Sequence, residues 1–197
     1  MPQTAIQPVS GAVLAAQSTF RKVMDATARP GSIQTIAQGA SGPAPLAAAT
    51  AAIALTLCDH DTPVWLDATF ATDAVTQWLR FNTGCPIVTD QAQSAFAVAG
   101  DLAALPQLES FALGTPDYPD RSTTLILQLA SLTGGERLTL SGPGIRDTAS
   151  LAPQGLPKDF IEQLAANRAL FPLGVDVLLV AGNDVAALPR TTIVARA

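Results

Sequence analysis

The sequence is poor in the side chains that most often carry out catalysis. It contains one histidine, His60, and two cysteines, Cys58 and Cys85. A serine-hydrolase triad would have to use this histidine, yet the chain has no G-x-S-x-G motif. The cysteines have no further cysteine or histidine at ligand spacing, which leaves no zinc signature, and two thiolates are too few for an iron–sulfur cluster. We therefore expect neither a metal centre nor a self-sufficient catalytic site.

Charged residues are also scarce, at 14% of the chain, and the net charge is -5 with a pI near 4.6. An acidic chain without a Lys/Arg run is repelled by nucleic acid and by acidic membranes, so neither is an expected partner. No stretch reaches the roughly 18 apolar residues of a membrane span, and no cationic leader is present, so we expect a cytoplasmic protein. Hydrophobic residues make up 48% of the chain, which predicts a large core or a surface covered by a partner.

Helical and strand patterns alternate along the chain. Ser10 is placed to cap a first helix, which Arg29-Pro30-Gly31 ends, and the next stretch, 32–45, has the composition of a loop. Further helices are expected over 46–57, 72–84 and 156–171, and strands over 62–66, 94–100, 175–180 and 191–196, with 181–189 as the last link. Residues 123–142 have the pattern of an antiparallel hairpin with Gly134-Gly135 in its loop. The expected fold class is α/β, one domain over 1–197 with a mixed sheet flanked by helices.

Two kinds of feature could bind an anion. The turn SGPGI, residues 141–145, follows an expected strand, and its Gly142 and Gly144 could leave backbone N–H groups open to a phosphate. It lacks the Lys-Ser/Thr ending of a P-loop, so simple chain reversal is the alternative. The arginines beside element boundaries or Gly/Pro turns could meet a phosphate or a partner's carboxylate: Arg21, Arg29, Arg121, Arg146 and Arg190. Helix capping and surface ion pairing are the alternative for each of them.

Two further groups of charged residues lie near expected turns. Asp59 and His60 form a polar cluster after the second helix, which either is an ordinary polar loop or belongs to an independent hydrolase or transferase site. With so few ligands, the cluster would hold a hard cation only weakly. In the tail, 171–192, Asp176 and Arg190 lie near the starts of the last two expected strands, where they could pair or face a neighbouring chain.

A series of short segments gives the chain a resemblance to one known family. In order they are FRKVMDATARPG, LTLCDHDTPVW, FNTGCP, GTPDYPDRSTTLIL, LSGPGI, FPLGVDVLLV and LPRTT. Through them the chain, from about Phe20 to Thr192, resembles the PhnH family, a subunit of the bacterial carbon–phosphorus lyase system. The resemblance implies a fold similar to the large domain of type I pyridoxal-phosphate-dependent transferases, without the cofactor.

The resemblance also implies a function and partners. A PhnH-like protein forms a homodimer and joins PhnG, PhnI and PhnJ in a core complex, with a PhnL-type protein present transiently. The family supports displacement of adenine from ATP by methylphosphonate, which gives ribose 1-methylphosphonate 5-triphosphate. The nucleosidase-like chemistry is attributed to PhnI, and cleavage of the carbon–phosphorus bond to PhnJ.

The lysines agree with a lost cofactor. Pyridoxal phosphate needs a lysine for its Schiff base, and the chain has only Lys22, inside the first expected helix, and Lys158, in the first turn of a later one. Neither follows a strand with phosphate-binding companions. We therefore expect no pyridoxal phosphate, no catalytic residue and a required but non-catalytic subunit. The alternatives are a subunit that binds a phosphorylated ligand through the arginines and the SGPGI turn, and an independent enzyme built around His60.

Overall fold

The computed structural model describes residues 11–36 and 41–197, which form two β-sheets and four α-helices. The helices are α1 (Gly11–Ala28), α2 (Ala48–Leu57), α3 (Asp73–Thr83) and α4 (Phe160–Ala169). The larger sheet contains β1 (Gln34–Thr35), β2 (Val64–Leu66), β3 (Ile87–Val88), β4 (Phe96–Ala99), β5 (Thr124–Gln128), β8 (Asp176–Ala181) and β9 (Asp184–Leu188). The smaller one contains β6 (Leu138–Ser141), β7 (Ala149–Leu151) and β10 (Ile193–Arg196). Three 3₁₀ turns complete the fold: η1 (Gln91–Gln93), η2 (Leu102–Ala104) and η3 (Leu108–Ser110).

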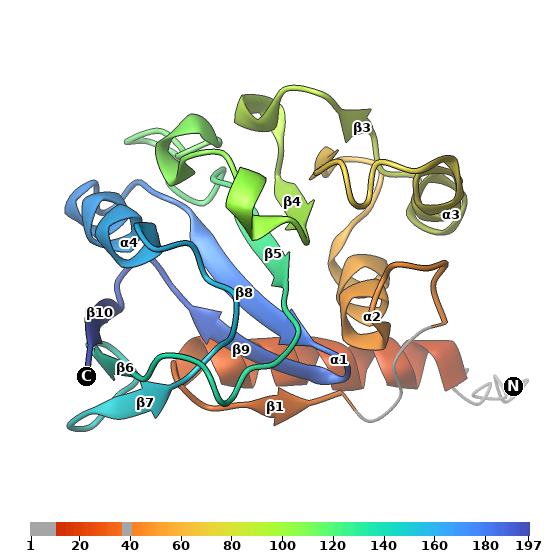
Figure 1. Ribbon diagram of the computed structural model, residues 1–197. Helices are drawn as coiled ribbons and strands as arrows, with labels where there is room; N and C mark the ends of the chain where they lie inside the picture. The colour runs from red at the N-terminus through yellow and green to blue at the C-terminus, as the bar shows by residue number, and fades with distance from the viewer. Residues whose placement is uncertain (1–10, 37–40) are drawn as a thin grey trace, which may run out of the picture.

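The larger sheet is mixed, with seven strands in the order β1-β9-β8-β5-β4-β2-β3 (Figure 1). Strands β3, β2, β4, β5 and β8 run parallel, whereas β9 is antiparallel to both of its neighbours. The parallel strands are short and apolar at consecutive positions, as in TLILQ of β5. This is the pattern of a strand that is buried on both faces.

Both faces of the larger sheet are covered. Alternate residues of β5 belong to different cores, with Ile126 on one side and Leu125 and Leu127 on the other. Helices α1, α2 and α3 pack on the first side, where α1 lies along β9 (Figure 1). On the second side lie α4, the turns η2 and η3, and the three-stranded sheet β10-β6-β7. The sheet is therefore the middle of three layers.

The hairpin expected within 123–142 is wrong. β5 pairs with β4 and with β8, so both of its backbone edges are occupied and none is left for β6. β6 instead pairs antiparallel with β7 and β10 in the smaller sheet. The glycine-containing loop that was expected to close a hairpin carries the chain from one sheet to the other.

The segments expected to be links contain two further strands. Residues 181–189 include β9, which pairs antiparallel with β8 across the turn Gly182-Asn183, where Gly182 has a φ of 57°. Within 32–45, Gln34 and Thr35 form β1 at the sheet edge. The expected N-cap residue Ser10 lies outside the described residues.

The third expected helix is confirmed at both ends. The Thr72 hydroxyl accepts a hydrogen bond from the backbone N–H of Val75, and Gly84 ends the helix in a left-handed conformation with a φ of 74°. Over the described ranges, no helix is both long and apolar enough to cross a bilayer. The likeness to pyridoxal-phosphate-dependent transferases stays a prediction.

Candidate functional site

The guanidinium of Arg190, in the segment between β9 and β10, binds four residues that belong to two other segments of the chain. Its Nε and Nη2 donate to the two carboxylate oxygens of Asp176 at 3.2 and 2.6 Å. Nη2 also donates to the Ser122 hydroxyl, and Nη1 donates to the carbonyl oxygens of Pro119 and Pro172 at 3.0 and 3.1 Å. The expectation that Asp176 and Arg190 can pair is therefore confirmed.

These contacts use the whole hydrogen-bonding capacity of the Arg190 side chain. A guanidinium carries five N–H groups, and the five side-chain bonds of Arg190 engage all of them. The side chain is only 12% exposed, and the backbone N–H of Arg190 also donates to Asp176. No donor of this arginine is left for a phosphate, so the geometry gives Arg190 a positioning role. We call Arg190 and its four partners the Arg190 clamp.

The clamp lies at the amino ends of β5 and β8, where a hollow of about 580 Å³ opens beside it. Its lining residues are Pro119, Asp120, Ser122, Thr124, Phe171, Pro172, Asp176, Pro189, Arg190 and Thr191. The side chain of Phe171 is 63% exposed. Apart from the neutralised ion pair, the exposed Asp120 is the one ionisable side chain among these lining residues, and prolines with one exposed aromatic ring suit contact with another chain better than acid–base chemistry.

The SGPGI turn packs against the end of α1. A Cβ atom at Gly144 would overlap the carbonyl oxygen of Ala28, the last residue of that helix, and Gly144 has a φ of 82°. A Cβ at Gly142 would approach the carbonyl oxygen of Thr191. Gly144 thus touches the negative end of a helix dipole, which disfavours a bound phosphate. These glycines permit close packing between α1, β6 and the segment that follows Arg190.

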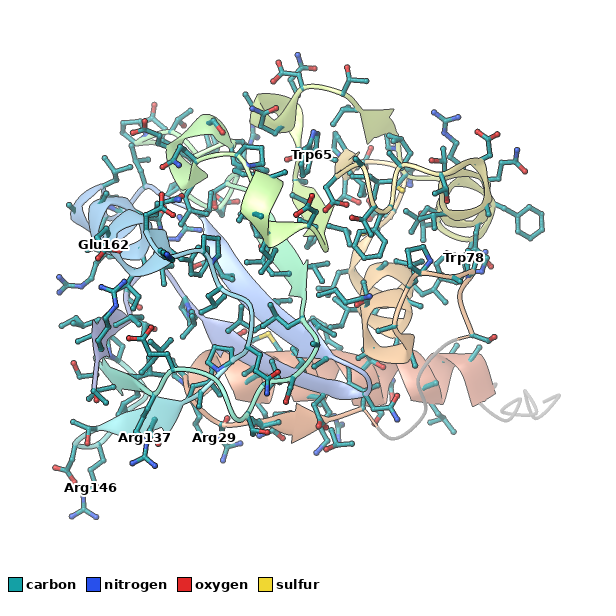
Figure 2. All side chains as sticks on the ribbon, in the orientation of Figure 1. Arg29, Trp65, Trp78, Arg137, Arg146 and Glu162 are labelled. Carbon is teal, nitrogen blue, oxygen red and sulfur yellow. The ribbon has the colours of Figure 1, made fainter. Side chains whose placement is uncertain are left out.

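The remaining arginines do not converge. Arg29, just after α1, forms an exposed ion pair with Asp25 in the last turn of that helix, and Arg21 is exposed on α1. Arg146 is exposed and points away from the fold at the tip beyond the SGPGI turn (Figure 2). Arg121 stacks over the Tyr118 ring, 4.2 Å from its centroid. The structure therefore does not bring these guanidinium groups together into one anion site.

The Asp59–His60 cluster lies on the surface. The imidazole Nε2 of His60 is 3.3 Å from a carboxylate oxygen of Asp61, and both side chains are about 80% exposed, at 79% and 82%. The Asp59 carboxylate accepts the backbone N–H of Asp61 within the same turn. No serine or threonine nucleophile is hydrogen-bonded to His60 among the contacts of the described residues. The cluster thus has the geometry of a polar turn.

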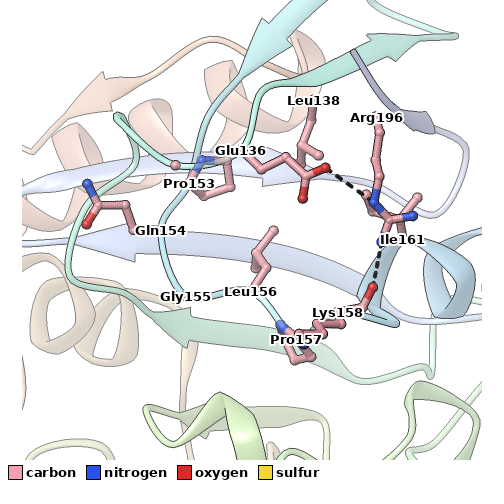
Figure 3. Close-up of a pocket in the computed structure, with 11 residues that line it drawn as sticks. Glu136, Leu138, Pro153, Gln154, Gly155, Leu156, Pro157, Lys158, Ile161 and Arg196 are labelled. Carbon is pink, nitrogen blue, oxygen red and sulfur yellow. Dashed lines mark hydrogen bonds and ion pairs between the residues drawn. The ribbon is translucent and has the colours of Figure 1, made fainter.

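A second hollow, of about 540 Å³, lies between the smaller sheet and the start of α4 (Figure 3). Arg196 crosses one side of it, 3.3 Å from the carboxylate of Glu136 and 2.7 Å from that of Glu162. The hydrogen bond from Arg196 lowers the pKa of Glu162 and raises that of Arg196. Lys158 also lines the hollow, just before α4 rather than inside its first turn. No sequence pattern marks this group, because its members come from three separate segments.

The two cysteines are buried thiols at the edge of the core beneath α2 and α3. Burial, with Cys85 and Asp59 nearby, raises the pKa of the Cys58 thiol to about 12. A thiol that stays protonated at neutral pH is a poor nucleophile and a poor metal ligand. In the described part of the chain, no three His, Cys, Asp or Glu side chains gather as a metal site.

Comparison with known proteins connects this fold to phosphonate metabolism. A family model described as "Bacterial phosphonate metabolism protein (PhnH)" matches residues 9–195. The chain is 48% identical over 180 residues to a Rhizobium meliloti protein named alpha-D-ribose 1-methylphosphonate 5-triphosphate synthase subunit PhnH; the match covers 91% of this chain and 90% of that protein. It is also 39% identical over 80 residues, 41% of each chain, to HtxG of Stutzerimonas stutzeri, which is described as a putative C-P lyase subunit protein.

Replacing Arg190 by lysine tests whether the clamp depends on the forked guanidinium. Arg190→Lys keeps the charge but cannot satisfy Asp176, Ser122 and both carbonyls, so we expect a loss of about 2–3 kcal/mol in the free energy of unfolding. Urea unfolding followed by circular dichroism measures it. Arg29→Lys is the matched control, because an exposed i,i+4 pair contributes only about 0.3–0.5 kcal/mol. Equal stability of the two variants would show that the clamp needs only a positive charge.

Replacing Gly144 by alanine tests the packing role of the SGPGI turn. Any alanine at a positive φ costs roughly 1–2 kcal/mol, and Gly144→Ala must additionally push aside the end of α1. Gly155→Ala is the control, since Gly155 has a φ of 88° but an added Cβ there would meet no atom within 4 Å. We expect the Gly144 variant to unfold at clearly lower urea than the control. Identical midpoints would remove the packing argument.

Proposed function

Because this chain belongs to the PhnH family of bacterial phosphonate metabolism proteins, we propose that it is the PhnH-type subunit of a carbon–phosphorus lyase complex. In that role it is a required, non-catalytic part of an alpha-D-ribose 1-methylphosphonate 5-triphosphate synthase. The observation that carries the proposal is the match over nine-tenths of both chains to the Rhizobium meliloti subunit of that name.

The geometry supports a non-catalytic role because the reactive groups are either paired or badly placed. Arg190 has no spare donor, and Arg196 lies between two glutamates. His60 is exposed and adjoins only its own turn, and the Cys58 thiol is held protonated. A transferase that displaces adenine from ATP needs groups that bind the phosphates and activate the attacking oxygen. We assign that chemistry to the partner subunits.

The proposed partners are a second copy of this chain and homologues of PhnG, PhnI and PhnJ, with a PhnL-type protein present transiently. Large apolar side chains on the surface support such contacts. Among those about half exposed or more are Leu14 and Met24 on α1, Phe81 on α3, and Tyr118 and Phe171 beside the Arg190 clamp. Exposed apolar side chains that flank one site, as Tyr118 and Phe171 do at the clamp, are typical of surfaces that another chain covers. The two reduced thiols suit the cytoplasm that we propose as its location.

We propose that the chain carries no pyridoxal phosphate and no iron–sulfur cluster. Lys22 points to Gln34, with its amine 3.4 Å from the amide oxygen, on the side of the sheet that α1 covers. Lys158 lines a hollow whose arginine is already bound to two carboxylates, so no arginine there is available to hold a cofactor phosphate. Two buried cysteines fall short of the three or four thiolates that a cluster needs.

Co-purification tests the assembly role directly. This chain, tagged and expressed with the PhnG, PhnI and PhnJ homologues of its host, is expected to retain them in fixed stoichiometry, and the chain alone is expected to be a dimer. Native mass spectrometry reads both masses. Recovery of this chain without any of the three would overturn the subunit proposal, and a monomer would remove the homodimer from it.

Activity of the assembled complex tests where the chemistry resides. His60→Ala in this chain is expected to leave the rate of adenine release from ATP and methylphosphonate within about twofold of the unaltered complex. Native mass spectrometry of the same sample shows that the variant is incorporated. A loss of more than about tenfold in a correctly assembled complex, approaching the effect of removing a general acid or base, would make His60 catalytic.

A further inference from the structure

The boundary between β2 and β4 is where ligands bind in many open α/β sheets. From β2 the chain crosses through α3 to β3 on the outer side, and it then returns to β4 on the inner side of β2. The direction of winding therefore reverses between these two parallel strands. Such a reversal opens a crevice at the carboxyl ends of the strands, and this crevice usually receives the ligand.

In this chain a carboxylate already lies at that position. Asp67 directly follows β2 and is 7% exposed. One of its oxygens accepts the backbone N–H groups of Gly100, at 2.7 Å, and Asp101, at 2.8 Å, just after β4. The other oxygen accepts the N–H of Phe70 at 3.1 Å, an N–H that is shared with the backbone carbonyl oxygen of Asp67, also at 3.1 Å. A Cβ at Gly100 would lie 2.9 Å from the Phe70 ring, so the approach also requires a glycine.

Converging backbone N–H groups are the means by which proteins bind phosphates and carboxylates. We propose that Phe70, Gly100 and Asp101 form an oxyanion site whose resident ligand is the chain's own Asp67 carboxylate. The crevice at the winding reversal is thereby closed to phosphate or carboxylate groups from solution. The self-occupied site is a property of the fold and does not depend on the subunit role.

A similar arrangement at the carboxyl end of the neighbouring strand, β5, supports the proposal independently. Gln128 ends β5, the neighbour of β4, and its amide oxygen accepts the backbone N–H of Ala47 and the hydroxyl of Thr50, both at 2.8 Å. Its amide nitrogen donates to the carbonyl oxygen of Pro45 at 2.9 Å. The amino end of α2, a second place where an anion could bind, is thus also occupied by a side chain from the sheet.

Chemical rescue tests the oxyanion site in the full-length protein. Asp67→Ala removes the carboxylate and frees the N–H groups of Gly100 and Asp101, while the N–H of Phe70 keeps its bond to the carbonyl oxygen of residue 67. The space left by the carboxylate has room for formate. We expect its urea midpoint to fall and then to recover by at least half as sodium formate is added, in a saturable way and relative to sodium chloride at equal ionic strength. If the variant is unfolded in chloride, circular dichroism is expected to show formate-dependent folding. No recovery at any formate concentration overturns the proposal.

Three controls make the result specific. Asp67→Asn fills the same space but turns an N–H₂ group or a weaker acceptor toward the site, so we expect lower stability without formate rescue. Asp90→Ala removes an exposed carboxylate that accepts a single backbone N–H, that of Ala92, at the start of η1, and no formate effect is expected there. In the unaltered protein, formate and inorganic phosphate are expected to leave the amide NMR signals of Gly100 and Asp101 unchanged. A saturable shift of these signals would show that the site is open and would overturn the proposal.

Discussion

The hydrogen bonds of Arg190 hold the amino ends of the parallel strands β5 and β8 in place. Asp176 begins β8, Ser122 precedes β5, and Pro119 and Pro172 belong to the two loops that lead into these strands. Since the guanidinium is mostly shielded from water, the loss of any partner leaves a poorly solvated charge or donor, which costs far more than an exposed pair contributes. Asp67 acts in the same way at the carboxyl ends of the strands, where it links β2 to the segment after β4. Charged side chains therefore hold both ends of the parallel strands, and the hydrogen-bonding atoms of these side chains are satisfied within the chain.

This use of charge fits the proposed non-catalytic role. In an enzyme with an open α/β sheet, an arginine and a set of backbone N–H groups at the ends of the strands would be left free to bind the substrate. Here each is satisfied before any ligand arrives. The exposed side chains that flank the clamp include the apolar rings of Phe171 and Tyr118, which are held by the loops that the clamp orders.

The sequence predicted those features that depend on neighbouring residues. The capping threonine and terminal glycine of α3 lie within one helix of each other and were found at Thr72 and Gly84. The pairing of Asp176 with Arg190 could be anticipated because both lie beside strand starts in one short tail. The hairpin failed because strand pairing depends on the whole sheet, although a signal was present. Leu125 to Leu127 are apolar without interruption, which marks a central strand, whereas Leu138 to Ser141 alternate, which marks a strand with one exposed face. Asp67 carried no such signal, because two of its three donors, Gly100 and Asp101, become its neighbours only when β2 and β4 pair.

The small number of unpaired charged side chains also affects the kind of complex that this chain can form. Charged residues make up 14% of the chain and several of them pair internally, so few exposed charges are left to form ion pairs with a partner. Association must then depend on apolar contact and fit, which slow the encounter but can greatly slow dissociation. Such a surface suits a subunit that is assembled once and remains in place. It does not suit a carrier that must bind and release a partner in each catalytic cycle, so the proposed role is that of a permanent component.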